Sequence, residues 1–120
     1  MISFRIEQIP PSYNRMFQIN YNLREVTLSK EAHIFKTNVK TRIPPTKFKD
    51  NALLRIEVEF HSNWYYKNGN IKKHDGDNLE KLLKDAIAEG LGISDSQFFE
   101  WQGKKVQDTE SYTLVNIMEI

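Results

Sequence analysis

The stretch from His74 to Leu83, HDGDNLEKLL, carries the residues of this chain that are best suited to chemistry. Asp75 and Asp77 flank a glycine, and Lys81 follows four residues after the second aspartate. Two carboxylates this close repel each other, so a nearby positive charge or hydrogen-bond donor must compensate them. Either the N-terminus of a helix or a divalent cation can do so.

A helix cap explains part of this pattern. Asp77 and Glu80 have the Asp-x-x-Glu spacing of a capping box, and Asp75 with its following glycine fits a turn. A third acid, Asp95 in GISDSQFF, is not explained in this way. A helix of about 13 residues is roughly 20 Å long. We therefore expect Asp95 to return to the other acids only if the next strand comes back antiparallel, alongside the preceding one.

If the three acids converge, the cation that they hold is Mg²⁺ or Mn²⁺, because hard oxygen ligands without His or Cys favour these ions. Such an ion neutralises a phosphodiester and lowers the pKa of an attacking water. A calcium-binding EF-hand is excluded. Counted from Asp75, its ligand positions 5 and 12 are Leu79 and Ala86, which offer no side-chain oxygen.

Lys81 stands one helical turn after Asp77, so its ammonium group is directed towards the same carboxylates. There it would stabilise an anionic transition state. The alternative is an ordinary i,i+4 ion pair with Asp77 or Asp85, which contributes a few tenths of a kcal/mol, about 0.2–0.5.

Other residues are candidates for contacts with phosphate. A lysine beside the acids can reach a nucleic-acid backbone, although each such lysine is equally well explained as a solvent-exposed residue. These candidates are Lys72, Lys73, Lys104 and Lys105. The aromatic run from Trp64 to Tyr66 could stack on an unpaired base. We expect it instead at the edge of the core or at a subunit contact.

Composition narrows the class of protein. The chain has 120 residues, 39% of them hydrophobic and 28% charged, which is typical of one soluble domain. It contains no cysteine, which excludes disulfides and thiolate sites. Residues 1–74 hold 13 Lys/Arg and 6 Asp/Glu, whereas residues 75–120 hold 4 and 10. We expect no signal peptide, no membrane span and a cytoplasmic location.

Two periodicities predict the elements. Alternating apolar residues indicate strands at residues 2–6, in ALLRIEVEFH, and in the closing segments FFEWQGKKVQ and SYTLVNIMEI. Helical spacing indicates Ser29–Ile43, and then about Asp77–Glu89 with Gly90 supplying a left-handed end. Asn68-Gly69 indicates a turn. The order predicts a single two-layer α+β domain over residues 1–120, with a mixed sheet and two main helices on one face.

In combination, these segments resemble the RusA-type Holliday junction resolvases. That family has the signature Asp-x-Asp-Asn-x-x-Lys, then a helix, then an acidic turn Asp-x-Gln, which DGDNLEKLLKDAI and SDSQ match. PPSYNRMF resembles its N-terminal Pro-Pro-Ser-x-Asn loop, and LSKEAHIFKTNV resembles the segment that opens its first helix. The resemblance places Asn14 near the acidic site, where it is a candidate for a DNA phosphate contact or, equally, a turn residue that satisfies its own loop. The resemblance covers most of the chain and extends to the fold.

The resemblance implies metal-binding roles for Asp75, Asp77 and Asp95 and a catalytic role for Lys81, with Mg²⁺ as cofactor and Mn²⁺ as a substitute. It further implies a homodimeric hydrolase of recombination and repair, often encoded by phages or prophages, that nicks two strands symmetrically at a four-way junction. We expect branched DNA as the partner and no organic cofactor. The alternative is a catalytically silent protein that binds branched DNA on the same scaffold.

Overall fold

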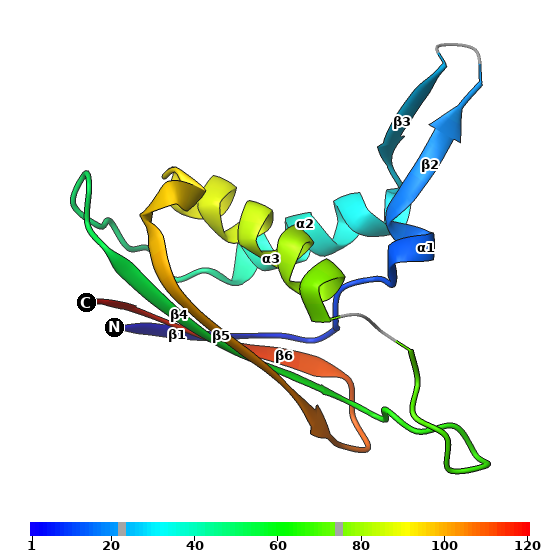
Figure 1. Cartoon of the computed structure of the whole chain (residues 1–120). Helices are drawn as coiled ribbons and strands as arrows, with labels where there is room; N and C mark the ends of the chain where they lie inside the picture. Colours follow the sequence, from blue (N-terminus) through cyan, green and yellow to red (C-terminus); the bar gives the residue numbers. More distant parts are fainter. Residues whose placement is uncertain (22–23, 74–75) are drawn as a thin grey trace.

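Four strands form a mixed sheet in the order β1-β6-β4-β5 (Figure 1). The computed structural model describes residues 1–21, 24–73 and 76–120, and the side chains of residues 13, 14, 20, 77 and 78 are also outside the description. The strands are β1 (Ile2–Ile6), β4 (Leu54–Ser62), β5 (Phe98–Gln107) and β6 (Tyr112–Glu119). Strand β6 is antiparallel to both β1 and β4, whereas β4 and β5 are parallel.

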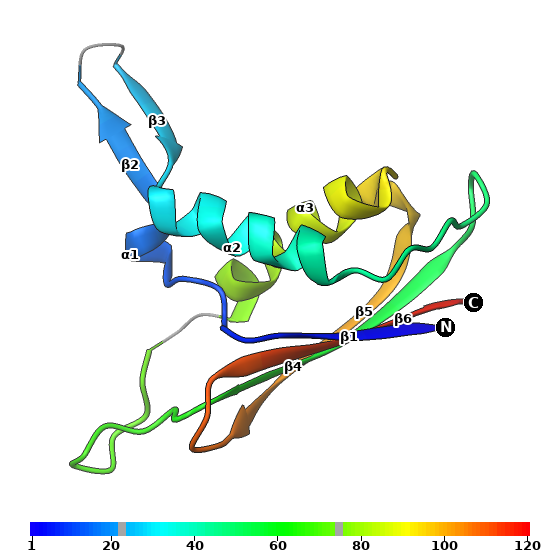
Figure 2. The same cartoon turned by 180° about the vertical axis from the view of Figure 1, so that it is seen from behind.

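Two helices, α2 (Lys30–Arg42) and α3 (Gly76–Leu91), cover one face of this sheet (Figures 1 and 2). Alternation along β4 turns Ile56, Val58 and Phe60 towards the helices, where they are buried. The stripe of α3 that includes Leu83 is also buried against them. The predicted two-layer α+β fold, with a mixed sheet and its helices on one face, is therefore confirmed.

Local chemistry fixes where α2 begins. The Ser29 side chain accepts a hydrogen bond from the Ala32 N–H at 3.2 Å, as an N-cap residue does. The same hydroxyl donates to the Arg15 carbonyl, and the Ser29 N–H donates to the Met16 carbonyl at 2.8 Å. Ser29 thus ties the start of α2 to the short helix α1 (Tyr13–Met16).

The prediction for the end of α3 was wrong by two residues. Gly90 lies inside the helix, and the left-handed residue is Gly92, with φ of 68°. The Ile93 N–H donates to the Ala88 carbonyl and the Gly92 N–H to the Glu89 carbonyl, which together make a Schellman motif. Gly90 serves another purpose, because a β-carbon there would collide with the side chain of Ile43. It permits the close approach of α2 and α3.

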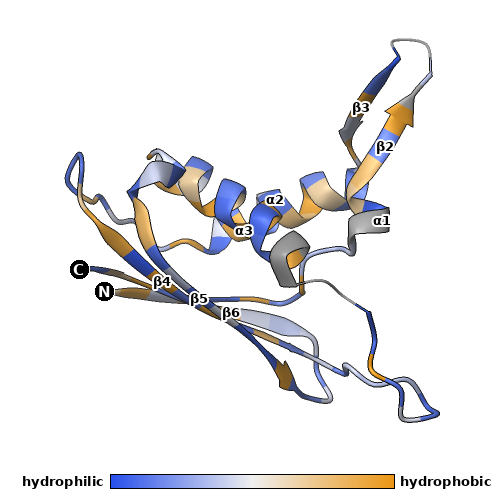
Figure 3. Ribbon diagram, viewed as in Figure 1, coloured by the Kyte–Doolittle hydropathy of each residue, from blue (hydrophilic) through white to orange (hydrophobic). Residues whose placement is uncertain are grey.

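Residues 17–20 and 25–28 form an arm that the sequence patterns did not predict. Strands β2 (Phe17–Asn20) and β3 (Glu25–Leu28) make an antiparallel pair that stands away from the two layers (Figures 1 and 2). Ile19 and Val26 face each other across this pair and are 58% and 67% exposed. The apolar colouring of β2 is visible on the arm in Figure 3. Because Ile19 and Val26 are exposed and are not part of the core, the sequence around them carries no long apolar pattern that predicts these strands.

The parallel pairing of β4 and β5 determines what lies at each end of α3. The chain leaves β4, passes through the turn at residues 66–70 and α3, and enters β5 beside the start of β4, with Phe98 opposite Leu54. Helix α3 therefore runs opposite to both strands. No helix within the described parts of the chain is long and apolar enough to cross a membrane.

Candidate active site

Two of the predicted metal ligands, Asp75 and Asp77, stand at or just before the first turn of α3, and the structure describes only the backbone of Asp77. Asp75 lies outside the described residues. Asp77 has helical backbone in the first turn of α3, but its side chain also lies outside the description. A helix begins at this point, as predicted, so its free N–H groups and the positive end of its dipole are available to anions. The metal-binding roles of both aspartates remain predictions.

Lys81 projects from α3 into solvent one turn further along. Within the described residues its ammonium group forms no ion pair, so the alternative pairing with Asp85 is absent. The pairing with Asp77 lies outside the described side chains. An exposed cation without a described partner, on the first turns of a helix, is suited to meet a phosphate group.

Asp95 lies at the opposite end of α3. It opens a short 3₁₀ turn, Asp95–Gln97, and is exposed. The Ser94 side chain accepts from the Ser96 N–H, and the Gln97 side chain donates to the Ala52 carbonyl at 3.0 Å, which anchors this turn beside the start of β4. With 16 residues, α3 is about 24 Å long. Asp95 is separated from Gly76 by roughly that length.

The expected antiparallel return is therefore wrong. The strand after α3 is parallel to the strand before it, and this pairing leaves Asp95 at the far end of the helix within one chain. Among the described residues there is no group of three or more His, Asp or Glu side chains that could hold a metal ion. Carboxylate oxygens suit Mg²⁺ in kind. The described part of a single chain contributes only Asp95 from the predicted ligands.

Lys72 and Lys73 stand in the chain shortly before the start of α3 at Gly76. The Lys72 N–H donates to the Trp64 carbonyl at 2.7 Å, which fixes this segment against the body of the protein. The Lys72 ammonium lies 5.9 Å from the centre of the Tyr66 ring, and the Lys73 side chain is exposed. Both lysines remain candidates for phosphate contacts on the chain segment that enters the acidic stretch.

Lys104 and Lys105 face opposite sides of the sheet, as consecutive residues of a strand do. The Lys104 ammonium is 3.4 Å from the Glu59 carboxylate, on the face away from the helices. The Lys105 ammonium lies 4.9 Å from the centre of the Trp64 ring. The predicted pair therefore does not form one cationic surface, and a duplex on one face of the sheet meets one of them at most.

The aromatic run divides into a core residue and two surface residues. Trp64 is 5% exposed, and its indole N–H lies within hydrogen-bonding distance of the carbonyls of Phe60 and Val106. Tyr65 and Tyr66 are 45% and 54% exposed. The expectation of a place at the edge of the core is confirmed for Trp64, whereas the two tyrosines remain accessible.

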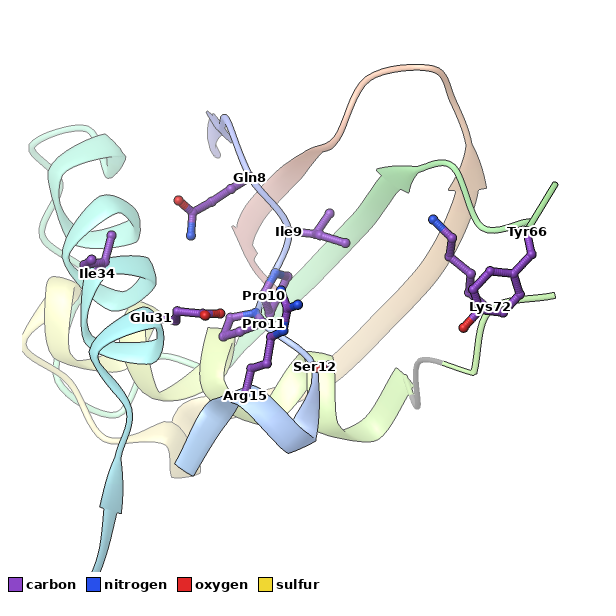
Figure 4. Close-up of a pocket in the computed structure, with 10 residues that line it drawn as sticks. All are labelled: Gln8, Ile9, Pro10, Pro11, Ser12, Arg15, Glu31, Ile34, Tyr66 and Lys72. Carbon is purple, nitrogen blue, oxygen red and sulfur yellow. The ribbon is translucent and has the colours of Figure 1, made fainter. Parts of the chain in front are cut away.

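A hollow of about 630 Å³ lies between the N-terminal loop, α2 and the segment that carries Lys72 (Figure 4). Arg15 lines it, and sequence reasoning missed this residue. It follows Asn14, whose side chain lies outside the description and whose predicted DNA contact stays a prediction. The available signal was the position of Arg15 inside PPSYNRMF, the segment that carries the family resemblance.

A charged cluster on the other face of the sheet surrounds His61, which is 8% exposed. Its Nδ1 lies 3.1 Å from an Asp108 carboxylate oxygen and its Nε2 lies 2.8 Å from one of Glu59. Its ring stacks on Tyr112, whose hydroxyl donates to Asp108. The backbone N–H of Glu110, followed by the bond from His61, lowers the pKa of Asp108 to about 2.

Comparison with protein families identifies the family of this chain. The model of the family described as Endodeoxyribonuclease RusA matches residues 8–118, which include both ends of α3, the N-terminal loop and the whole hollow. The chain therefore belongs to the RusA endodeoxyribonuclease family, a class of DNA-cleaving enzymes. A comparison with curated proteins found no match.

Proposed function

We propose that the chain is a Mg²⁺-dependent endodeoxyribonuclease that resolves four-way DNA junctions as a homodimer, by paired symmetric cuts. Membership of the RusA endodeoxyribonuclease family supports the reaction class. The observation that carries the proposal of a dimer is the position of Asp95, one helix length away from the start of α3. Within one chain Asp95 is about a helix length from the backbone of Asp77, and we infer from this that a complete set of ligands draws on a second copy.

In a homodimer with a two-fold axis, the set of metal ligands can be completed in two places. If two copies of α3 lie antiparallel across such an axis, the N-terminal turn of each helix comes beside the C-terminal end of the other. Asp75 and Asp77 of one protomer would then share a site with Asp95 of its partner. A two-fold dimer repeats every contact, so two identical sites result, one for each strand to be cut.

Each residue has a distinct role in the proposed site. Asp75, Asp77 and the partner's Asp95 would hold Mg²⁺, for which Mn²⁺ is a substitute because both ions prefer oxygen ligands. The bound ion supplies charge neutralisation at the phosphate and a water of lowered pKa. Lys81 would place its ammonium group against the charge that develops on the phosphate. Lys72 and Lys73 would hold the neighbouring backbone.

The decisive experiment uses end-labelled four-way junctions and linear duplexes of the same sequence, with and without Mg²⁺. We expect paired cuts in the junction only with Mg²⁺, or with Mn²⁺ in its place. Asp75→Asn should abolish cleavage and preserve or strengthen binding, because it removes one negative charge near the DNA. Binding without cleavage by the unmodified protein, at any concentration of Mg²⁺, would identify the catalytically silent alternative.

A further inference from the structure

The hollow beside α1 has the walls of a pocket for a planar ligand. Ile9, Pro10 and Pro11 form one side, and the Tyr66 ring stands across from them (Figure 4). Its volume of about 630 Å³ lies within the ~300–1,000 Å³ range of small-molecule sites. Paired bases in a duplex are held in their stack, so a base can enter such a pocket only after leaving it.

The pocket also carries charge for a phosphate. Arg15 and Lys72 line it, against a single acid, Glu31. None of these three side chains forms an ion pair within the described residues, so no carboxylate neutralises either cation. The Lys72 ammonium lies 5.9 Å from the centre of the Tyr66 ring, so this charge stands beside the ring that would meet the base. An excess of cations beside an apolar and aromatic wall matches the two halves of a nucleotide: an anionic phosphate and a planar base.

Hydrogen bonds hold the backbone on both sides of the pocket. The Tyr66 N–H donates to the Asn70 carbonyl at 2.8 Å, and the Gly69 N–H donates to the Tyr66 carbonyl at 2.9 Å. On the other side, the Arg15 N–H donates to the Ser12 carbonyl at 2.9 Å, and its own carbonyl accepts from the Ser29 hydroxyl. Ordered backbone on both sides lowers the entropy lost on binding.

The pocket adjoins the proposed cleavage site. Lys72 is one of its lining residues and lies only a few residues before the start of α3 at Gly76. We infer that a DNA strand whose phosphate is held near that helix end passes the mouth of the pocket. At a branch point the strands change partners, and a nucleotide there leaves its stack at lower cost than one inside a duplex.

We propose that this pocket receives one unstacked nucleotide of the branched DNA, with its base against Tyr66 and its phosphate on Arg15 and Lys72. The proposal rests on the proposed function, because it takes branched DNA as the ligand. It assigns to Tyr66 a role in selecting branched over linear DNA. A linear duplex offers no unpaired base, so the stacking contact with Tyr66 forms only at a branch.

A photochemical experiment tests the contact directly. 5-Iodouracil replaces thymine at one position at a time around the branch point, and the protein–junction complex is irradiated without divalent cation. We expect a covalent crosslink at one of these positions, with Tyr66 as the modified residue in the digested complex. Crosslinks only at other residues, or none at any position while the junction stays bound, would overturn the proposal.

Matched variants separate stacking from a structural effect. Tyr66→Ala should lose the crosslink and bind the junction about fivefold or more weakly, while its affinity for linear duplex stays the same. Tyr66→Phe should keep both, because it retains the ring. Tyr65→Ala is the control, since Tyr65 is similarly exposed and does not line this pocket. Equal losses in Tyr65→Ala and Tyr66→Ala would contradict the assignment.

The outcome is separable from that of the proposed function. Cleavage of unmodified junctions with Mg²⁺ tests the nuclease, whereas the crosslink is read without metal and without cleavage. If the protein cuts junctions but never crosslinks through Tyr66, the nuclease proposal stands and the pocket proposal fails. If the protein crosslinks through Tyr66 but never cuts, the pocket proposal stands and the nuclease proposal fails.

Discussion

Leu54 and Phe98 are partners in the parallel register of β4 and β5, and this pairing places Asp95 beside the start of β4. The start of α3 lies at the other end of the same strand. Any site that uses both Asp77 and Asp95 must therefore bridge about one helix length or draw on two chains. We therefore propose that the active site forms only in a dimer.

Mixing two inactive variants tests this sharing. We expect Asp75→Asn and Asp95→Asn to be inactive separately, and a mixture of the two to regain cleavage. In the mixed dimer one site carries both substitutions and the other carries neither, so one strand of the junction is nicked. End-labelled junctions on a denaturing gel report the single nick. If each chain formed its own site, both sites would be defective and the mixture would stay inactive.

Lys81→Met should slow cleavage strongly and leave the fold intact. The side chain is exposed and has no ion pair among described residues, so the loss concerns charge opposite the phosphate. Loss of one preorganised charge of this kind costs about 100-fold or more in rate. Single-turnover cleavage at saturating protein measures it. Lys49→Met, another exposed lysine in the loop before β4, serves as the control and should cleave at the normal rate.

Gly92, the left-handed residue that ends α3, leads to a prediction about stability. Gly92→Ala should lower the free energy of unfolding by about 1–2 kcal/mol, because a β-carbon is strained at its φ of 68°. Gly92→Asn should cost less, since asparagine tolerates this conformation better. Urea denaturation followed by circular dichroism compares the two. Equal stability of Gly92→Ala and the unmodified protein would contradict the assigned cap.

Acid should destabilise the protein partly through Asp108. The pKa of this carboxyl is lowered from 3.8 to about 2 by the Glu110 N–H and by His61, so it favours the folded state when ionised. Its stabilising contribution is present above about pH 4 and is lost as the pH falls towards 2. Asp108→Asn should remove this part of the pH dependence. Denaturation measured at several pH values between 5 and 2 should therefore give a shallower decline for the variant.

The sequence alone determined the layers of this protein. Alternation in ALLRIEVEFH and the apolar stripe after Asp77 predicted β4 and α3, because each pattern buries one face of one element. The family signature in DGDNLEKLL and SDSQ likewise stands in consecutive residues. The arm formed by β2 and β3 escaped prediction because Ile19 and Val26, which pair across it, are largely exposed and are not part of the core.

Only the tertiary structure decided which end of the fold each candidate occupies. Strand direction depends on long-range pairing, and no local pattern states whether β5 is parallel or antiparallel to β4. That choice separated Asp95 from the start of α3. What it did not decide is that Lys104 and Lys105 face opposite sides of the sheet, because consecutive residues of any strand alternate in this way. The hollow between Arg15, Tyr66 and Lys72 does arise from the tertiary structure, because its walls come from segments about 50 residues apart in the chain.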